Sequence, residues 1–290
     1  MKPYIKNIKM KYFLLIILIS FIHLGSTAQL RVKKVMIDGN GAPLVFLHGA
    51  TTNMSGLDKP TKLLSGSFRV IRMESFNSQY AAENRTLPGS YSIQIESEGV
   101  GYTLDSLGVA EPVILVGSSY GGLIALDYAI NHPERIKSLI LLEPVAFGLN
   151  EVRKERPEGF DKTEKISVQL KPTAEITDEL VKEFRCLQVN CDSVNILNLP
   201  QWKTWLEQRN RLRGLSAAFE HKIDSKTLKK FTRPVLIVTG TLTAPLNKRI
   251  DELLHAELPT SKLSYIQSGH SIPTTAPEEL AKMINDFLSK

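Results

Sequence analysis

Short apolar runs, separated by amphipathic segments, recur along the chain from Pro43 onward. Most of these runs are rich in valine, isoleucine and leucine, as expected for strands that are buried on both faces of a parallel sheet. The strand candidates are Leu44–Leu47, Phe68–Arg72, Val113–Val116, Ser138–Leu142, Val235–Thr239 and Lys262–Ile266.

The segments between these runs carry the spacing of helices. The clearest lies at the C-terminus, where Leu280 is followed by Met283, Ile284, Phe287 and Leu288, which together form one apolar helix face. Strands that alternate with such helices predict an α/β fold, with a mostly parallel central sheet and helices on both faces.

The stretch 146–230 breaks this alternation. It is polar, has helical spacing and contains no strand pattern, and it includes the two tryptophans of the chain, Trp202 and Trp205. We therefore expect a helical cap, or lid, over 146–230 that is inserted between two strands. The α/β core would then consist of 29–145 and 231–290.

The N-terminus has the pattern of a secretory signal peptide. Lysines precede an apolar run of 13 residues, Tyr12–Leu24, which is followed by small residues up to Ala28. A transmembrane anchor is the alternative, but a span needs about 20 apolar residues. We expect cleavage after Ala28, which would leave an exported protein, periplasmic or secreted, without a stable membrane span.

Charge argues against nucleic acid as a partner. The net charge of the chain is +6, but residues 1–28 hold four lysines and no acid. The remainder therefore carries 32 basic and 30 acidic residues, a net charge of +2. A nearly neutral chain lacks the general electrostatic footprint of a nucleic-acid-binding protein.

The two cysteines, Cys186 and Cys191, lie close together in sequence. In an exported chain they are expected to form a small disulfide loop, although two free thiols at a helix end are the alternative. No second Cys or His pair lies nearby, so a metal site is not expected.

The segment with the strongest chemical signal is Gly117-Ser118-Ser119-Tyr120-Gly121, which has the form G-x-S-x-G. It follows an apolar strand candidate and precedes an amphipathic helix, so Ser119 would occupy a tight strand-to-helix turn. Such a turn raises a serine Oγ above the sheet edge, where it can act as a nucleophile. A glycine-rich turn without chemistry is the alternative.

From about Pro43 to its C-terminus, the chain resembles the α/β-hydrolase superfamily. The G-x-S-x-G turn carries this resemblance, together with the strand that leads into His48-Gly49-Ala50. The resemblance implies an oxyanion hole made by the backbone N–H groups of Ala50 and Tyr120. It also implies that His48 is structural rather than catalytic.

The resemblance implies a base near the C-terminus, and the Gly-His pair at His270 follows the last strand candidate. In most members the acid follows the preceding strand, where this chain has Thr243, which cannot ionise. Some branches, certain haloalkane dehalogenases and lipases among them, keep the acid on a neighbouring strand. Glu143 has that position and is the expected acid, although it could instead cap the strand.

Together these residues predict an exported serine hydrolase that cleaves a carboxylic ester through an acyl-enzyme on Ser119, with no cofactor and no metal. Its partner would be a small acyl substrate, which Trp202 and Trp205 could contact unless they only tie the cap to the core. The same triad could serve carbon–carbon bond hydrolysis or acyl transfer. A ligand-binding protein on a hydrolase scaffold is an alternative of another class.

Overall fold

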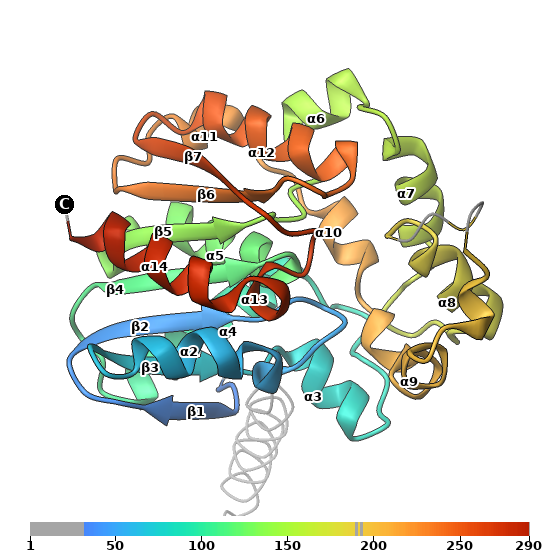
Figure 1. The fold of residues 1–290 in the computed structure, drawn as a ribbon, viewed down its shortest axis with the longest axis horizontal. Helices are drawn as coiled ribbons and strands as arrows, with labels where there is room; N and C mark the ends of the chain where they lie inside the picture. Colours follow the sequence, from blue (N-terminus) through green and yellow to red (C-terminus); the bar gives the residue numbers. More distant parts are fainter. Residues whose placement is uncertain (1–31, 189–190, 192–193, 290) are drawn as a thin grey trace, which may run out of the picture.

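The computed structural model describes residues 32–188, 191 and 194–289, so the expected signal peptide, 1–28, lies outside the described residues. Seven strands form one sheet in the order β1-β3-β2-β4-β5-β6-β7 (Figure 1). Their bounds are β1 Val35–Asp38, β2 Ala42–Leu47, β3 Phe68–Met73, β4 Val113–Ser118, β5 Ile136–Leu142, β6 Val235–Gly240 and β7 Ser261–Ile266.

Each of the six apolar runs forms a strand, and all neighbouring pairs from β3 to β7 are parallel. Strand β1, which pairs antiparallel with β3 at the sheet edge, was not among the strand candidates. Its residues are mostly exposed, so this short strand lacks the apolar run that marks the others. The predicted α/β class with a mostly parallel sheet is confirmed.

Helices follow most of the strands and cover both faces of the sheet (Figure 1). Those of the α/β core are α2 Asp58–Leu64, α3 Phe76–Ala82, α4 Ile93–Ser106, α5 Tyr120–Asn131, α12 Pro245–Glu257, α13 Ile272–Thr275 and α14 Pro277–Leu288. Short 3-10 turns occur at Met54–Leu57, Pro133–Arg135, Ile196–Asn198 and Arg209–Leu212. Within the described part of the chain, no helix is both long enough and apolar enough to cross a membrane.

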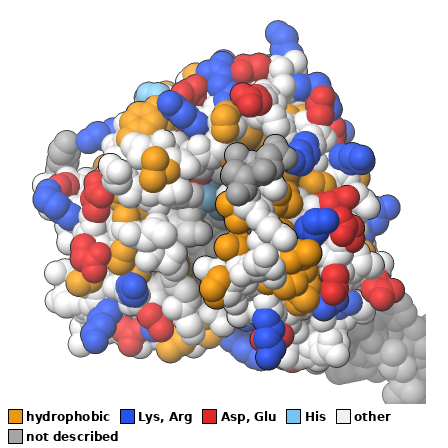
Figure 2. Space-filling view, turned by 45° about the vertical axis from the view of Figure 1, so that its right-hand side comes forward, with side chains coloured by type: hydrophobic (Ala, Val, Ile, Leu, Met, Phe, Trp, Pro, Cys, Tyr) orange, Lys and Arg blue, Asp and Glu red, His pale blue; other side chains and the backbone are white. Residues whose placement is uncertain are grey.

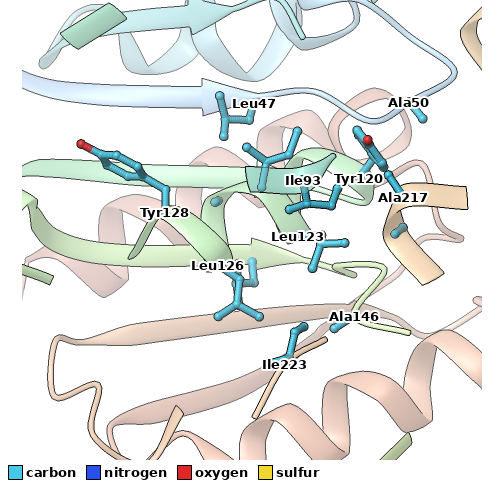
Figure 3. Close-up of a cluster of buried hydrophobic side chains, with 14 of the residues drawn as sticks. Leu47, Ala50, Ile93, Tyr120, Leu123, Leu126, Tyr128, Ala146, Ala217 and Ile223 are labelled. Carbon is cyan, nitrogen blue, oxygen red and sulfur yellow. The ribbon is translucent and has the colours of Figure 1, made fainter. Parts of the chain in front are cut away.

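Two apolar layers stabilise the sheet, because successive strand residues point to opposite faces. On one face, Val45 and Leu115 pack in the layer that includes α4, α5 and α12. On the other face, Leu44 and Val116 pack in the layer that includes α2 and α14. Figure 3 shows part of the first layer, in which Leu123 and Leu126 of α5 belong to the same cluster as Leu47 of β2 and Ile223 of the segment between β5 and β6.

The segment between β5 and β6 is helical. Its helices are α6 Asn150–Glu155, α7 Phe160–Ser167, α8 Asp178–Arg185, α9 Trp202–Glu207, α10 Ser216–Glu220 and α11 Ser225–Leu228. Although this segment intervenes, β5 and β6 pair directly. An isolated bridge between Leu149 and Ile223 joins its two ends. Helices α7, α8 and α9 lie together beside the sheet, at the edge where the parallel strands end (Figure 1).

Candidate active site

Ser119 lies on a strained turn between β4 and α5. Its φ of 54° and ψ of −117° are rare for a residue with a side chain. The turn requires glycine on both sides. A Cβ on Gly117 would lie 2.3 Å from the Gly121 carbonyl oxygen, and one on Gly121 would lie 2.5 Å from that of His48. The G-x-S-x-G spacing is therefore a steric requirement of this backbone, which presents Ser119 at the strand end.

His270 lies in the loop between β7 and α13, and its Nε2 is 2.9 Å from Ser119 Oγ. The two residues are 151 positions apart in sequence, so only the fold brings them into hydrogen-bond contact. At this distance a neutral imidazole can accept the hydroxyl proton. The sequence had named both residues, as nucleophile and base.

Glu143 directly follows β5, and its Oε2 accepts a hydrogen bond from His270 Nδ1 at 2.7 Å. Its side chain is fully buried, and its other oxygen, Oε1, accepts from the backbone N–H of Gly240 at 2.7 Å. Glu143 also has a positive φ, 45°, which turns the chain immediately after the strand. The contact orients the His270 ring so that Nε2 faces Ser119.

The oxyanion donors expected from sequence lie beside Ser119. A Cβ added to Gly49 would be 3.3 Å from Ser119 Cβ, so the Gly49–Ala50 segment lies against the nucleophile. Within the described residues, neither the Ala50 N–H nor the Tyr120 N–H has a hydrogen-bond acceptor. These two amides are therefore available to an oxyanion.

His48 is buried, and its described side-chain contacts are with residues other than Ser119. Its Nδ1–H donates to the Gly49 carbonyl oxygen at 2.8 Å, and its Nε2 lies 2.8 Å from Glu74 Oε1. Burial raises the pKa of Glu74, but hydrogen bonding and the charge of His48 outweigh burial and lower it below its usual value. Because the Gly49 carbonyl and the Ala50 N–H belong to one peptide unit, His48 fixes the orientation of that amide.

A family model described as the alpha/beta hydrolase fold matches residues 42–277. The chain belongs to the alpha/beta hydrolase fold family. The uncharacterized hydrolase YugF of Bacillus subtilis is 24% identical over 84% of this chain and 89% of its own. A 2-hydroxymuconate semialdehyde hydrolase of Pseudomonas putida is 34% identical, but the match covers only 37% of this chain and 38% of that protein.

Among solved structures, the esterase RhEst1 of Rhodococcus sp. ECU1013 superposes with a TM-score of 0.69. The two proteins are 20% identical, and the match covers 89% of this chain and 97% of that one. A likeness at this level of identity establishes a shared fold. The activity of an alpha/beta hydrolase fold protein depends on the side chains of its site rather than on the fold.

In this family member, a cavity of about 410 Å³ lies over Ser119 and His270. The core contributes the Gly49–Thr52 loop, and the segment between β5 and β6 contributes residues of α7, α8 and the turn after α8. The surface is hollowed near the centre of Figure 2, and a histidine side chain lies in the hollow. A volume of this size suits a small molecule.

Trp202 and Trp205 are not among the residues that line this cavity, which corrects the expectation that they face the substrate. Both are partly buried against the apolar core, and the Trp205 ring lies 4.6 Å from Cζ of Arg185. The lining instead includes Phe184, Arg185 and Leu187. Phe184 and Arg185 are the last two residues of α8, and Leu187 lies in the turn that follows, so the C-terminal end of α8 forms this part of the cavity wall.

Cys186 and Cys191 are joined by a disulfide with a Cα–Cα distance of 5.4 Å. Cys186 also lines the cavity, directly after α8. The bridge therefore holds the turn that follows α8, next to the site. Among the residues with described positions, no group of three or more His, Cys, Asp or Glu side chains could hold a metal ion.

Sequence reasoning missed two polar residues of the site. Asn247, near the start of α12, donates to Glu143 Oε2 at 3.3 Å, and its amide nitrogen lies 3.1 Å from His270 Nδ1. Its position four residues after Thr243, at a helix start, is the signal that could have found it. Arg185 was also missed, because a basic residue on an amphipathic helix is usually exposed.

Proposed function

We propose that this protein is a serine hydrolase that cleaves a carboxylic ester through an acyl-enzyme on Ser119. One observation carries the proposal: Ser119 Oγ, His270 and Glu143 form a continuous hydrogen-bonded series, with distances of 2.9 and 2.7 Å. Ser119, which lies on a strained turn, is the end of this series that lines the cavity. This arrangement suits acyl transfer to a serine.

In the first half of the reaction, Ser119 Oγ forms a bond to the ester carbonyl carbon while His270 Nε2 takes the hydroxyl proton. The N–H groups of Ala50 and Tyr120 stabilise the charge that develops on the carbonyl oxygen. Collapse of the tetrahedral intermediate breaks the bond to the alcohol oxygen, and His270 returns the proton to that oxygen. The products are the free alcohol and the acyl-enzyme.

In the second half, water replaces the alcohol. His270 takes a proton from water as the oxygen attacks the acyl carbon, and the same two amides hold the second oxyanion. The bond to Ser119 Oγ then breaks, and His270 returns the proton to the serine. Glu143 stabilises the imidazolium in both halves without taking its proton, and the sum is ester plus water to acid plus alcohol.

The helices between β5 and β6 would act as a lid. The support is that α7, α8 and the residues after α8 line the cavity over Ser119. The proposed boundaries stay 146–230 for the lid and 29–145 with 231–290 for the core. Export after removal of residues 1–28 is a separate proposal, and sequencing the N-terminus of the secreted chain would test it by a start at Gln29.

Labelling with a fluorophosphonate tests the proposed function without knowledge of the substrate. We expect one adduct on Ser119, mapped by mass spectrometry and absent from Ser119→Ala. Ser118→Ala is the matched control, since Ser118 also lines the cavity and should leave labelling unchanged. A folded protein that stays unlabelled while a control esterase reacts would overturn the proposal in favour of a binding protein.

Product analysis separates the other reactions that this triad could support. A carboxylic acid and an alcohol, formed in equal amounts from a 4-nitrophenyl ester, are expected for a hydrolase. Transfer of the acyl group to an added alcohol in preference to water would identify an acyltransferase. Turnover of diketones in the absence of ester turnover would identify a carbon–carbon bond hydrolase.

A further inference from the structure

Arg185 is a buried cation in the wall of the cavity that contains Ser119. It is the last residue of α8, it is 7% exposed, and it lines the cavity. The other charged residues of the lining, apart from His270, are Glu158 and Lys162, and both are exposed. Arg185 is therefore the buried charged side chain that a molecule bound inside the cavity would contact.

No carboxylate among the described residues forms an ion pair with Arg185. Its Nη1 donates to the neutral side chain of Gln188 at 3.0 Å, and its buried Nε has no hydrogen-bond partner in the part of the chain that the structure describes. Burial lowers its pKa to about 10, far below that of a free guanidinium. Buried charges in proteins are normally paired, so within the described residues this guanidinium lacks an anionic partner.

Two aromatic rings pack against the Arg185 guanidinium and hold it in place, but they do not pair its charge. Its Cζ lies 4.6 Å from the Trp205 ring and 5.7 Å from the Phe184 ring. Such cation–π contacts stabilise the positive charge, but they provide no hydrogen-bond acceptor for the N–H groups of the guanidinium. Rings around a planar guanidinium orient it, and a carboxylate is the group that its N–H donors fit best.

We infer that the substrate is a small ester that carries a carboxylate, which Arg185 binds while Ser119 attacks the ester carbonyl. This inference rests on the proposed function and specifies its substrate class. Ser119 and Arg185 line the same cavity of about 410 Å³, so the inferred substrate is one that extends from one residue to the other within this cavity. The exposed Lys162 adds a positive charge to the lining, and the exposed Glu158 adds a negative one. Discrimination between anionic and neutral esters would therefore depend on Arg185.

Two pairs of esters test the inference, one pair with the carboxylate on each side of the ester bond. The first is 4-nitrophenyl hemiglutarate against its neutral methyl ester. The second is 4-(butyryloxy)benzoate against its methyl ester. In at least one pair, we expect kcat/KM for the anionic member to exceed that for the neutral member by about tenfold or more. A difference of this size is what a hydrogen bond to a charged group contributes.

Arg185→Met should lower kcat/KM for the preferred anionic ester about 10- to 100-fold and leave its neutral partner within about threefold. Arg185→Lys keeps the charge and should retain part of the preference, which guards against a misfolded methionine variant. Lys162→Met is the matched control, since it removes an exposed cation from the same lining and should change the preference by less than about threefold.

If a folded Arg185→Met protein lost kcat/KM equally for both members of each pair, Arg185 would have a structural role, and the inference would be overturned. A preference for the neutral members in the wild-type protein would overturn it as well. Calorimetric binding of monomethyl glutarate to Ser119→Ala separates this failure from failure of the proposed function, because it needs no turnover. Binding should weaken at least tenfold when Arg185→Met is added, and no weakening would also overturn the inference.

Discussion

Thr243 Oγ1 donates a hydrogen bond to Glu143 Oε2 at 2.7 Å. Thr243 stands where most relatives of this fold are expected to carry the acid, and Glu143 comes from the neighbouring strand, β5. The same Glu143 oxygen accepts from His270 Nδ1. The hydroxyl at the usual acid position therefore helps to hold Glu143, the carboxylate that we propose as the acid of the triad.

Removal of that hydroxyl should weaken catalysis without abolishing it. Thr243→Val keeps the shape of the side chain but removes one donor to Glu143, whose contacts to Gly240 and Asn247 remain. We expect kcat/KM on a 4-nitrophenyl ester to fall about tenfold, since a hydrogen bond to a charged group contributes about 1.5–3 kcal/mol. Thr243→Ser, the control, should stay within about threefold, and equal effects of both variants would contradict this role.

Loss of the Glu143 charge should have a much larger effect. Glu143→Gln keeps the size of a side chain that is fully buried, but it offers His270 an amide in place of a carboxylate. By analogy with triad acids, kcat should fall about 10³- to 10⁴-fold. The rate of fluorophosphonate labelling and the melting temperature should be measured together. Activity within a few-fold of wild type would remove Glu143 from the proposed triad.

The elbow should not tolerate a methyl group at Gly121. An added Cβ would lie 2.5 Å from the carbonyl oxygens of both His48 and Leu47, and neither backbone segment can move without displacing the oxyanion loop. We expect Gly121→Ala to lose labelling of Ser119 and to lower the free energy of unfolding by about 1–3 kcal/mol. Gly66→Ala, which meets no atom within 4 Å, is the control and should be close to neutral.

Asp251 should make stability depend on pH in a direction unusual for an aspartate. Burial raises its pKa well above the usual value, and its Oδ2 accepts from Thr239 Oγ1 at 2.6 Å. The folded state therefore keeps a proton that the unfolded state releases near pH 4. This contribution to stability is complete below about pH 4 and is lost as pH rises toward the folded-state pKa, by at most about 1.4 kcal/mol per pH unit.

Asp251→Asn removes this titration. The free energy of unfolding should be measured with urea between pH 4 and 8. As pH rises, it should increase for the variant relative to the wild-type protein, because the amide never ionises. Glu98→Gln, a substitution at an exposed site, should leave the pH dependence unchanged. A constant difference between wild type and Asp251→Asn across this range would show that Asp251 does not titrate differently on folding.

The sequence specified the strands and the elbow because their signals are local. Six apolar runs form the parallel sheet, and the G-x-S-x-G turn gives Ser119 its positive φ. It also named His270 and Glu143, from their places after strand candidates. Strand β1 escaped notice because an exposed edge strand needs no apolar run.

Tertiary structure alone decided which side chains face the cavity. Arg185 and the two tryptophans lie in amphipathic segments whose sequence gives an apolar face, but not the neighbour against which that face packs. Packing placed Arg185 in the cavity wall and kept Trp202 and Trp205 out of it. The same holds for Thr243 and Asn247, which contact Glu143 from about 100 residues away. Local periodicity is set along the chain, whereas contacts across such separations exist only after the strands have paired and the helices have docked.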